Sequence, residues 1–135
     1  MSTSKPEPRG RIQSMIDYIL EDYAGHDTAV LRRLKVASAS YNPTPCTTLR
    51  LIITPDLCNN HGNLHGGAIA TIFDSCTTFP ILLAREEGSW ETLGVSRTLN
   101  VAYLAAVKEG EEIEVEAEVV GIGKRLGRCH CALLM

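Results

Sequence analysis

The sequence has no excess of basic residues, since 13 Lys and Arg against 16 Asp and Glu give a formal net charge of −3. Without a broad positive field, neither nucleic acid nor an anionic membrane is an expected partner. No apolar run reaches the roughly 18 residues of a membrane-spanning helix. Residues 1–10 contain no apolar signal core. We therefore expect a disordered lead-in at 1–10 and a single domain over 11–135.

A disulfide framework is missing as well. The number of cysteines is odd, and their spacing is not that of a disulfide-bonded domain. They are Cys46, Cys58, Cys76, Cys129 and Cys131. We expect free thiols that act as small hydrophobic residues in a reducing compartment. The expected location is the cytoplasm. A mitochondrial location stays open, although Glu7 and the two prolines of the lead-in speak against it.

The spacing of apolar residues predicts an α+β fold. Helical spacing predicts a helix over residues 11–23, and Asp27 or Thr28 could cap a short second helix that ends at Leu34. Pro80 should kink a longer apolar helix over residues 68–84 or mark its last turns. Strand-like texture and turn residues predict strands near residues 35–41, 47–53, 92–104, 111–120 and 126–134.

Two of these segments predict how the elements pack. The run 68–84 is apolar nearly all round, so we expect the rest of the protein to enclose it. In the strand at 111–120, Ile, Val and Ala alternate with Glu, which predicts one face on the core and the other in water. An antiparallel sheet wrapped around a long central helix satisfies both patterns.

Candidate chemistry lies around the start of the apolar helix. Gly66 and Gly67 let the backbone approach a ligand closely and leave N–H groups unpaired, and the helix dipole adds a partial positive charge. Close packing of helix on sheet would also explain the glycines. Asp74 is a carboxylate within an apolar helix, where an ionised group is costly without a partner. It could instead be a structural carboxylate that holds a neighbouring loop.

The spacing of these two features limits how they can cooperate. Asp74 lies eight residues after Gly66, which is roughly 12 Å along a helix axis. One chain cannot easily bring both groups to the same carbon atom. Two such helices antiparallel across a two-fold axis could, which would give two equal sites in each dimer.

The sequence resembles the hotdog-fold thioesterases, in particular those of the phenylacetate pathway and the acyl-CoA thioesterase 13 group. The resemblance starts near Leu34 and rests on the motif Asn59-x-x-Gly62-Asn63-Leu64-His65-Gly66-Gly67 with Asp74, then on Gly94-Val95-Ser96 and Asn100-Val101-x-Tyr103-Leu104. It implies a hotdog fold and hydrolysis of acyl-CoA thioesters without metal or other cofactor. It also implies a homodimer or homotetramer.

The resemblance assigns roles to individual residues. Gly66 would polarise the thioester carbonyl through its backbone N–H, and Asn59 would position the carbonyl or the attacking water. Asp74 of the opposite subunit would act as general base or nucleophile, and Ser96 would orient the water. His65 would shape the loop or contact the carbonyl, and Gly67 would lie beside the substrate. Apart from the resemblance, Arg97, Lys124, Arg125 and Arg128 could meet the coenzyme A phosphates, although such residues are usually just surface charge.

Other readings stay open. A hotdog dehydratase or hydratase is the enzymatic alternative, and a non-catalytic acyl-CoA-binding relative is the other. Family members of this type usually continue past the strand at 126–134 with a further strand, and we expect that strand to be absent here. Cys58, His61 and His65 resemble metal-ligand spacing, but Gly62 and Asn63 between the histidines argue against a helix and no fourth ligand is apparent. No metal site is therefore predicted.

Overall fold

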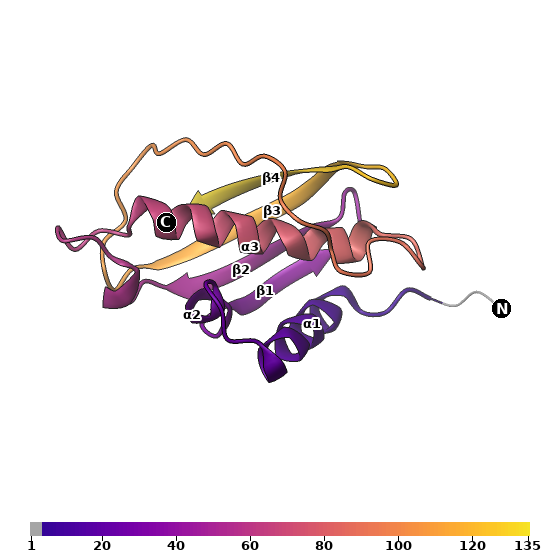
Figure 1. Ribbon diagram of the computed structural model, residues 1–135, viewed down its shortest axis with the longest axis horizontal. Helices are drawn as coiled ribbons and strands as arrows, with labels where there is room; N and C mark the ends of the chain where they lie inside the picture. Colours follow the sequence, from indigo (N-terminus) through magenta and orange to yellow (C-terminus); the bar gives the residue numbers. More distant parts are fainter. Residues whose placement is uncertain (1–3) are drawn as a thin grey trace.

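Two N-terminal helices precede an antiparallel sheet, and a long helix is inserted between its second and third strands (Figure 1). This computed structural model describes residues 4–135. The elements are α1 (Pro8–Asp22), α2 (Thr28–Leu31), β1 (Lys35–Ser40), β2 (Cys46–Ile52), the 3-10 turn η1 (Pro55–Leu57), α3 (Gly66–Ala84), β3 (Glu112–Ile122) and β4 (Gly127–Leu134). The strands lie side by side in the order β1-β2-β3-β4.

The centre of the sheet confirms the predicted alternation. Leu51 of β2 is opposite Ile113 of β3, and Leu49 is opposite Val115. All four side chains are at most 1% exposed, because they face α3. The glutamates of β3 point the other way, where one of them pairs with a basic residue of β2 in an exposed salt bridge. A sheet with one covered face is what this pattern requires.

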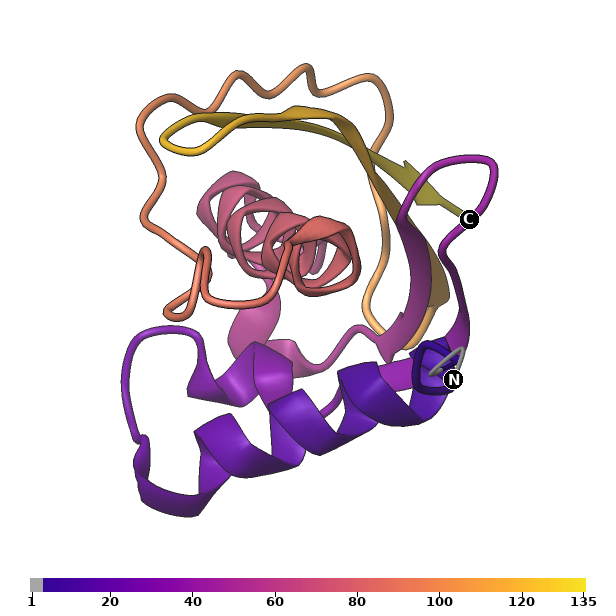
Figure 2. The same ribbon diagram turned by 90° about the vertical axis from the view of Figure 1, so that its right-hand side faces the viewer.

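The sheet curls around α3, as the end-on view in Figure 2 shows. The buried residues of α3 are Ile72, Ser75, Cys76, Phe79, Pro80, Leu82 and Leu83, and Pro80 lies near the helix end, as expected. The prediction of a fully enclosed helix is wrong, however, because Asp74 is exposed. Only one side of α3 packs on the sheet. By length and composition α3 could also cross a membrane, but a core helix passes the same test.

Residues 92–104, predicted as a strand, form no strand in the structure. Val95 and Leu104 are 96% and 92% exposed. A strand is stabilised by the hydrogen bonds of a neighbouring ladder, and this segment pairs with no strand among residues 4–135. Trp90 holds its start instead, by donating from Nε1 to the carbonyl of Gly123 (2.9 Å). Gly94 has φ +77° and leaves no room for a Cβ beside the Trp90 ring.

The N-terminal helix begins earlier than predicted. It starts at Pro8 rather than at Arg11, because the carboxylate of Glu7 accepts hydrogen bonds from the backbone N–H groups of Arg9 (2.9 Å) and Gly10 (2.6 Å). A side-chain acceptor of this kind caps a helix N-terminus. The expected disordered lead-in therefore does not extend to residue 10, and its first three residues lie outside the described part of the chain.

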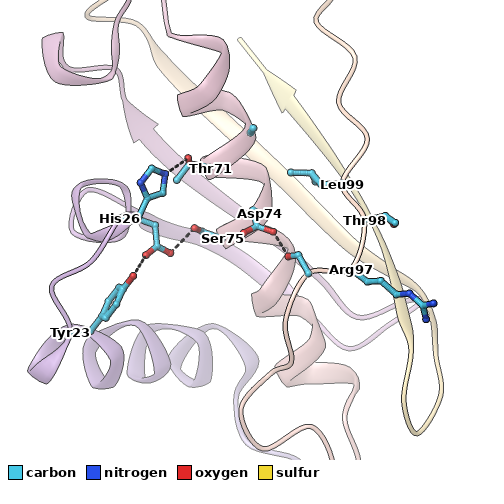
Figure 3. Close-up of a pocket in the computed structure, with 11 residues that line it drawn as sticks. Tyr23, His26, Thr71, Asp74, Ser75, Arg97, Thr98 and Leu99 are labelled. Atoms are coloured by element: carbon cyan, nitrogen blue, oxygen red, sulfur yellow. Dashed lines mark hydrogen bonds between the residues drawn. The ribbon is translucent and has the colours of Figure 1, made fainter.

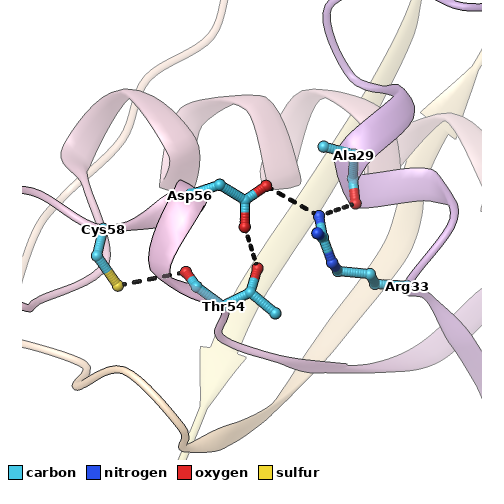
Figure 4. A network of polar contacts seen from close by, with 5 residues as sticks. All are labelled: Ala29, Arg33, Thr54, Asp56 and Cys58. Carbon is cyan, nitrogen blue, oxygen red and sulfur yellow. Dashed lines mark hydrogen bonds and ion pairs between the residues drawn. The ribbon is translucent and has the colours of Figure 1, made fainter.

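A polar network fastens the turn η1 to α2 (Figure 4). Arg33 donates to the carbonyl of Ala29 (2.8 Å) and to the carboxylate of Asp56 (3.1 Å). Asp56 also accepts from the Thr54 hydroxyl at 2.5 Å, and that bond, followed by the charge of Arg33, lowers the pKa of Asp56. Cys58 donates from Sγ to the Thr54 carbonyl (3.5 Å). The network fixes the start of the loop that leads into α3.

The five cysteines are free thiols in the structure, as predicted. Burial raises the pKa of Cys76 in α3 well above its usual value. Burial, with a smaller effect of Cys129, raises the pKa of Cys131 in β4 to about 12. These thiols therefore behave as small core residues rather than as nucleophiles.

Candidate active site

Asp74 and Ser96, which the resemblance assigned to one site, are hydrogen-bonded to each other within one chain of the structure. Asp74 projects from the uncovered side of α3, and Ser96 lies in the segment that follows the helix. The Ser96 hydroxyl donates a hydrogen bond to Oδ1 of Asp74. This bond fixes the orientation of the carboxylate and leaves Oδ2 with no partner among residues 4–135. A solvent-accessible carboxylate oriented in this way can accept a proton from water.

The Asp74 carboxylate opens on a cavity of about 620 Å³. Figure 3 shows α3 as its floor, with the connection between α1 and α2 on one side and residues 96–99 on the other. The lining residues are Tyr23, His26, Asp27, Ala70, Thr71, Asp74, Ser75, Ser96, Arg97, Thr98 and Leu99. The volume is within the range of small-molecule sites, but the lining is more polar than usual.

One wall of the cavity is formed by the connection between α1 and α2. The sequence analysis did not identify this connection as part of a site. Asp27 was expected only as a possible helix cap, and its side chain makes no capping bond. Instead, its two carboxylate oxygens accept from the hydroxyls of Tyr23 and Ser75, each at 2.8 Å. The bond from Tyr23 is the main cause that raises the pKa of that hydroxyl. The absence of a side chain at Gly25 allows the Tyr23 ring to fold back.

The start of α3 is shaped by the residues of the glycine motif. Nδ1 of His65 accepts from the backbone N–H of Gly67 (2.8 Å), so His65 is the N-cap of the helix. The N–H of Gly66 donates to no group of residues 4–135. Tyr103, part of the motif but assigned no role from the sequence, donates to the Gly66 carbonyl (2.9 Å). The Gly66 N–H thus remains available to a ligand oxygen.

The structure keeps the two halves of the predicted site apart. Asn59, His65, Gly66 and Gly67 do not line the cavity that holds Asp74. The side-chain oxygen of Asn59 accepts from the N–H groups of His61 (2.9 Å) and Asn63 (3.2 Å), which folds the loop on itself. This separation within one chain agrees with the helical spacing of Asp74 and Gly66.

The predicted phosphate-contacting residues are not gathered together either. Arg97 lines the cavity, but its guanidinium points away from Asp74 in Figure 3. Lys124 and Arg125 are exposed in the turn between β3 and β4 and do not line the cavity. Within the described residues, no group of three His, Cys, Asp or Glu could hold a metal ion. The chemistry available here is proton transfer by a carboxylate beside hydrogen-bond donors.

Comparison with known proteins identifies the family of this chain. The family model described as "Thioesterase superfamily" matches residues 61–134. Acyl-coenzyme A thioesterase 13 of Mus musculus is 34% identical over 97 residues, which cover 72% of this chain. The chain spans 64% of the length of that relative.

Solved structures show the same fold. The zebra fish thioesterase superfamily member 2 has a TM-score of 0.77 and 29% identity, and the match covers 96% of this chain and 86% of that one. The PaaI protein from the phenylacetic acid degradation operon of E. coli has a TM-score of 0.66 at 15% identity, with 93% and 82% covered. These neighbours have the hotdog fold expected from the sequence. The chain belongs to the thioesterase superfamily.

Proposed function

We propose that this protein hydrolyses acyl-CoA thioesters to a carboxylic acid and coenzyme A. The observation that carries the proposal is the Asp74 carboxylate, which accepts a hydrogen bond from Ser96 and lines a cavity. The similarity to acyl-coenzyme A thioesterase 13 supports the reaction class. The substrate is then an acyl-CoA.

In the proposed reaction, Asp74 accepts a proton from a water molecule that Ser96 helps to orient. The water oxygen attacks the thioester carbonyl carbon, and the carbonyl oxygen becomes an oxyanion. Collapse of this intermediate breaks the carbon–sulfur bond, expels the coenzyme A thiolate and leaves the carboxylic acid. The thiolate then receives the proton held by Asp74. A backbone N–H at a helix N-terminus, as at Gly66, is a suitable donor to the oxyanion.

The oxyanion donor would come from a second copy of the chain. Within one α3, Gly66 and Asp74 are separated by eight residues, about 12 Å along the axis. Neither the Gly66 end of the helix nor Asn59 borders the Asp74 cavity of its own chain. A two-fold dimer with antiparallel α3 helices would place Asp74 of one copy against Gly66 of the other. Asn59 would then position the carbonyl at the same end.

The first test is turnover by the wild-type protein on a panel of acyl-CoAs. We expect free thiol and carboxylic acid to appear in equal amounts. Formation of an enoyl thioester from a hydroxyacyl-CoA, seen by its ultraviolet absorbance and without thiol release, would indicate a dehydratase. Binding without any product, from a folded protein, would indicate a non-catalytic relative. Either result would contradict the proposal.

Mixed dimers test the shared site. Gly66→Pro removes the N–H at the first helical position, where proline is tolerated. The added Cβ would be in ordinary contact with the Tyr103 ring, 3.4 Å from Cε1, and His65 already has the extended backbone that a following proline needs. Asp74→Asn removes the base. Each variant alone should be inactive, but a mixture re-formed from monomers should regain about a quarter of the wild-type activity, because half of the dimers then contain one intact site. No recovery would contradict a site between subunits.

A further inference from the structure

A second cavity, which we call the basic cavity, lies between the α2–β1 connection and the ends of β2 and β3. Its volume is about 370 Å³, and it shares no lining residue with the Asp74 cavity. Its lining residues are Arg32, Arg33, Leu34, Lys35, Arg50, Leu51, Ile52, Thr54 and Glu112. Four of these nine residues are basic and one is acidic, although the chain as a whole has a net charge of −3.

The sheet places two of the basic residues against each other. Lys35 of β1 is directly opposite Arg50 of β2, and both are exposed. Residues opposite each other in an antiparallel pair share a face, and like charges in such positions destabilise the sheet. Glu114 of β3 accepts from Nε of Arg50 (3.0 Å), but this salt bridge is exposed and therefore weak. An anion bound between Lys35 and Arg50 would replace their repulsion by attraction.

Most hydrogen-bond donors of the basic cavity have no partner within the described chain. The side chains of Arg32 and Lys35 form no hydrogen bond or salt bridge with residues 4–135. Arg33 uses only Nη1, for the two contacts that Figure 4 shows, and Arg50 uses only Nε. The planar fork of donors on arginine matches the oxygens of phosphate, and a lysine adds a point charge.

The apolar part of the lining indicates what carries the phosphate. Ile52 is 46% exposed and lies in the lining together with Leu34 and Leu51. An apolar surface beside arginines suits the flat base of a nucleotide, on which a guanidinium also stacks. The volume is at the lower end of the range for small-molecule sites. The basic cavity therefore fits a single nucleotide rather than a polymer.

The turn η1 connects the basic cavity with the start of α3. Thr54 lines the cavity and directly precedes η1, and the carbonyl of Leu57, the last residue of η1, accepts from the N–H of His65 (2.8 Å). The basic cavity is thus at the same end of α3 as Gly66. Phosphate groups bound there could belong to the coenzyme A of a substrate whose thioester lies at Gly66, or to a free nucleotide.

We propose that the basic cavity is a binding site for the phosphate groups of a nucleotide, with Arg32, Lys35 and Arg50 as the main donors. This inference goes beyond the proposed hydrolysis, because binding requires no turnover. The coenzyme A of the substrate and a free nucleotide are the two sources that the experiment separates.

The test measures the Kd of adenosine 3′,5′-bisphosphate by titration calorimetry at low salt, beside adenosine. The wild type should bind the bisphosphate at one saturable site per chain and adenosine much more weakly. Arg32→Gln and Lys35→Gln should each raise the Kd by about tenfold, the worth of one charge-assisted hydrogen bond. Glu112→Gln removes the acidic residue of the lining and should lower the Kd by about twofold to fivefold. Lys108→Gln, at an exposed residue outside the cavity, is the matched control and should keep the wild-type Kd.

No saturable binding by the folded wild type, or a Kd unchanged in both Arg32→Gln and Lys35→Gln, would overturn the proposal. The source of the phosphates follows from the KM for an acyl-CoA and for the same acyl thioester of pantetheine, which has no phosphate. A higher KM of Lys35→Gln for the acyl-CoA alone would assign the cavity to the substrate, and unchanged KM values would assign it to a free nucleotide. If neither thioester is hydrolysed, the proposed function fails, but the Kd values still decide this inference.

Discussion

The centre of the sheet and its β4 edge are built differently. β3 has a strand on each side, β2 and β4, and its inward residues Ile113 and Val115 are fully buried. Among residues 4–135, β4 has a strand neighbour on one side only, and its inward residues Cys129, Cys131 and Leu133 are half-buried. Residues 92–104 lie beyond this edge and form no strand hydrogen bonds with β4. The sheet therefore packs tightly on α3 at β2 and β3 and less tightly at β4.

This difference matters for the site because Asp74 lies on the well-packed helix α3, whereas Ser96 lies in the unpaired segment 92–104. Asp74 is on α3, one side of which packs on the central strands. Ser96 is in the outer segment, which is held at its start by Trp90 and further on by Tyr103. The carboxylate thus sits on a rigid element, whereas the group that orients it depends on a few side-chain contacts. Low local stability of this kind is common where a site must admit a ligand.

Hydrogen exchange should show the largest contrast. We expect the amide of Val115 in β3 to exchange on the order of a thousandfold more slowly than the amide of Val95, because only the first is in a ladder and buried. Residue-resolved exchange by NMR measures this. Equal protection at both positions would mean that residues 92–104 are paired in solution.

The next largest effect is the difference in unfolding free energy between a substitution in the core and one in residues 92–104. Ile113→Ala should lower the free energy of unfolding by about 2–5 kcal/mol, since it removes buried methyl groups from a packed core. Val95→Ala, at a side chain that is 96% exposed, should change it by less than about 0.5 kcal/mol. Urea titrations with unchanged m-values check both. A large cost at Val95 would show that something covers this residue in solution.

The attachment of the outer segment should have a smaller effect. Trp90→Phe removes the hydrogen bond to Gly123 and should cost about 1 kcal/mol. Amide exchange in residues 94–104 should also become faster, while β2 and β3 stay as slow as in the wild type. Tyr18→Phe, at a side chain that is 71% exposed, is a control that should change neither quantity. If exchange in β3 accelerated as much as in 94–104, the two regions would unfold as one unit.

The effect of Cys131 is absent at neutral pH and appears only as the pH becomes alkaline. Its pKa is raised to about 12 in the folded protein, so the folded state is disfavoured once the unfolded thiol ionises. The contribution to stability is complete below the unfolded pKa of about 8.5 and is lost as the pH rises towards the folded value. Stability of the wild type should therefore fall more steeply between about pH 8.5 and 12 than that of Cys131→Ala. Parallel curves would contradict the burial of this thiol.

The sequence predicted well those segments in which the order of apolar and polar residues alone shows which side is buried. The alternation in 111–120 was enough to identify β3 and its buried face, and the apolar run with Gly66 located α3 to within two residues. Ser96 was singled out by the motif, not by periodicity, and its hydrogen bond to Asp74 was not predicted. These features depend on local spacing or on residue types that are rarely used together.

The features that the sequence missed depend on contacts with distant segments. Residues 92–104 have strand texture, but no pattern within them tells whether a neighbouring strand is present. The exposure of Asp74 depends on how far other elements wrap around α3. Tyr23, His26 and Asp27 looked like the end of one helix and the cap of the next, since nothing local indicates that Asp27 reaches Ser75.

The most direct test of the central claim is kcat for thioester hydrolysis by Asp74→Asn, beside the wild type and Asp17→Asn. Asp17 is an exposed carboxylate of α1 outside the cavity, so its variant controls for the loss of one negative charge. We predict that Asp74→Asn keeps the wild-type fold by circular dichroism but loses at least about 100-fold in kcat, while Asp17→Asn keeps its activity. An Asp74→Asn protein that hydrolyses the substrate at the wild-type rate would contradict the account.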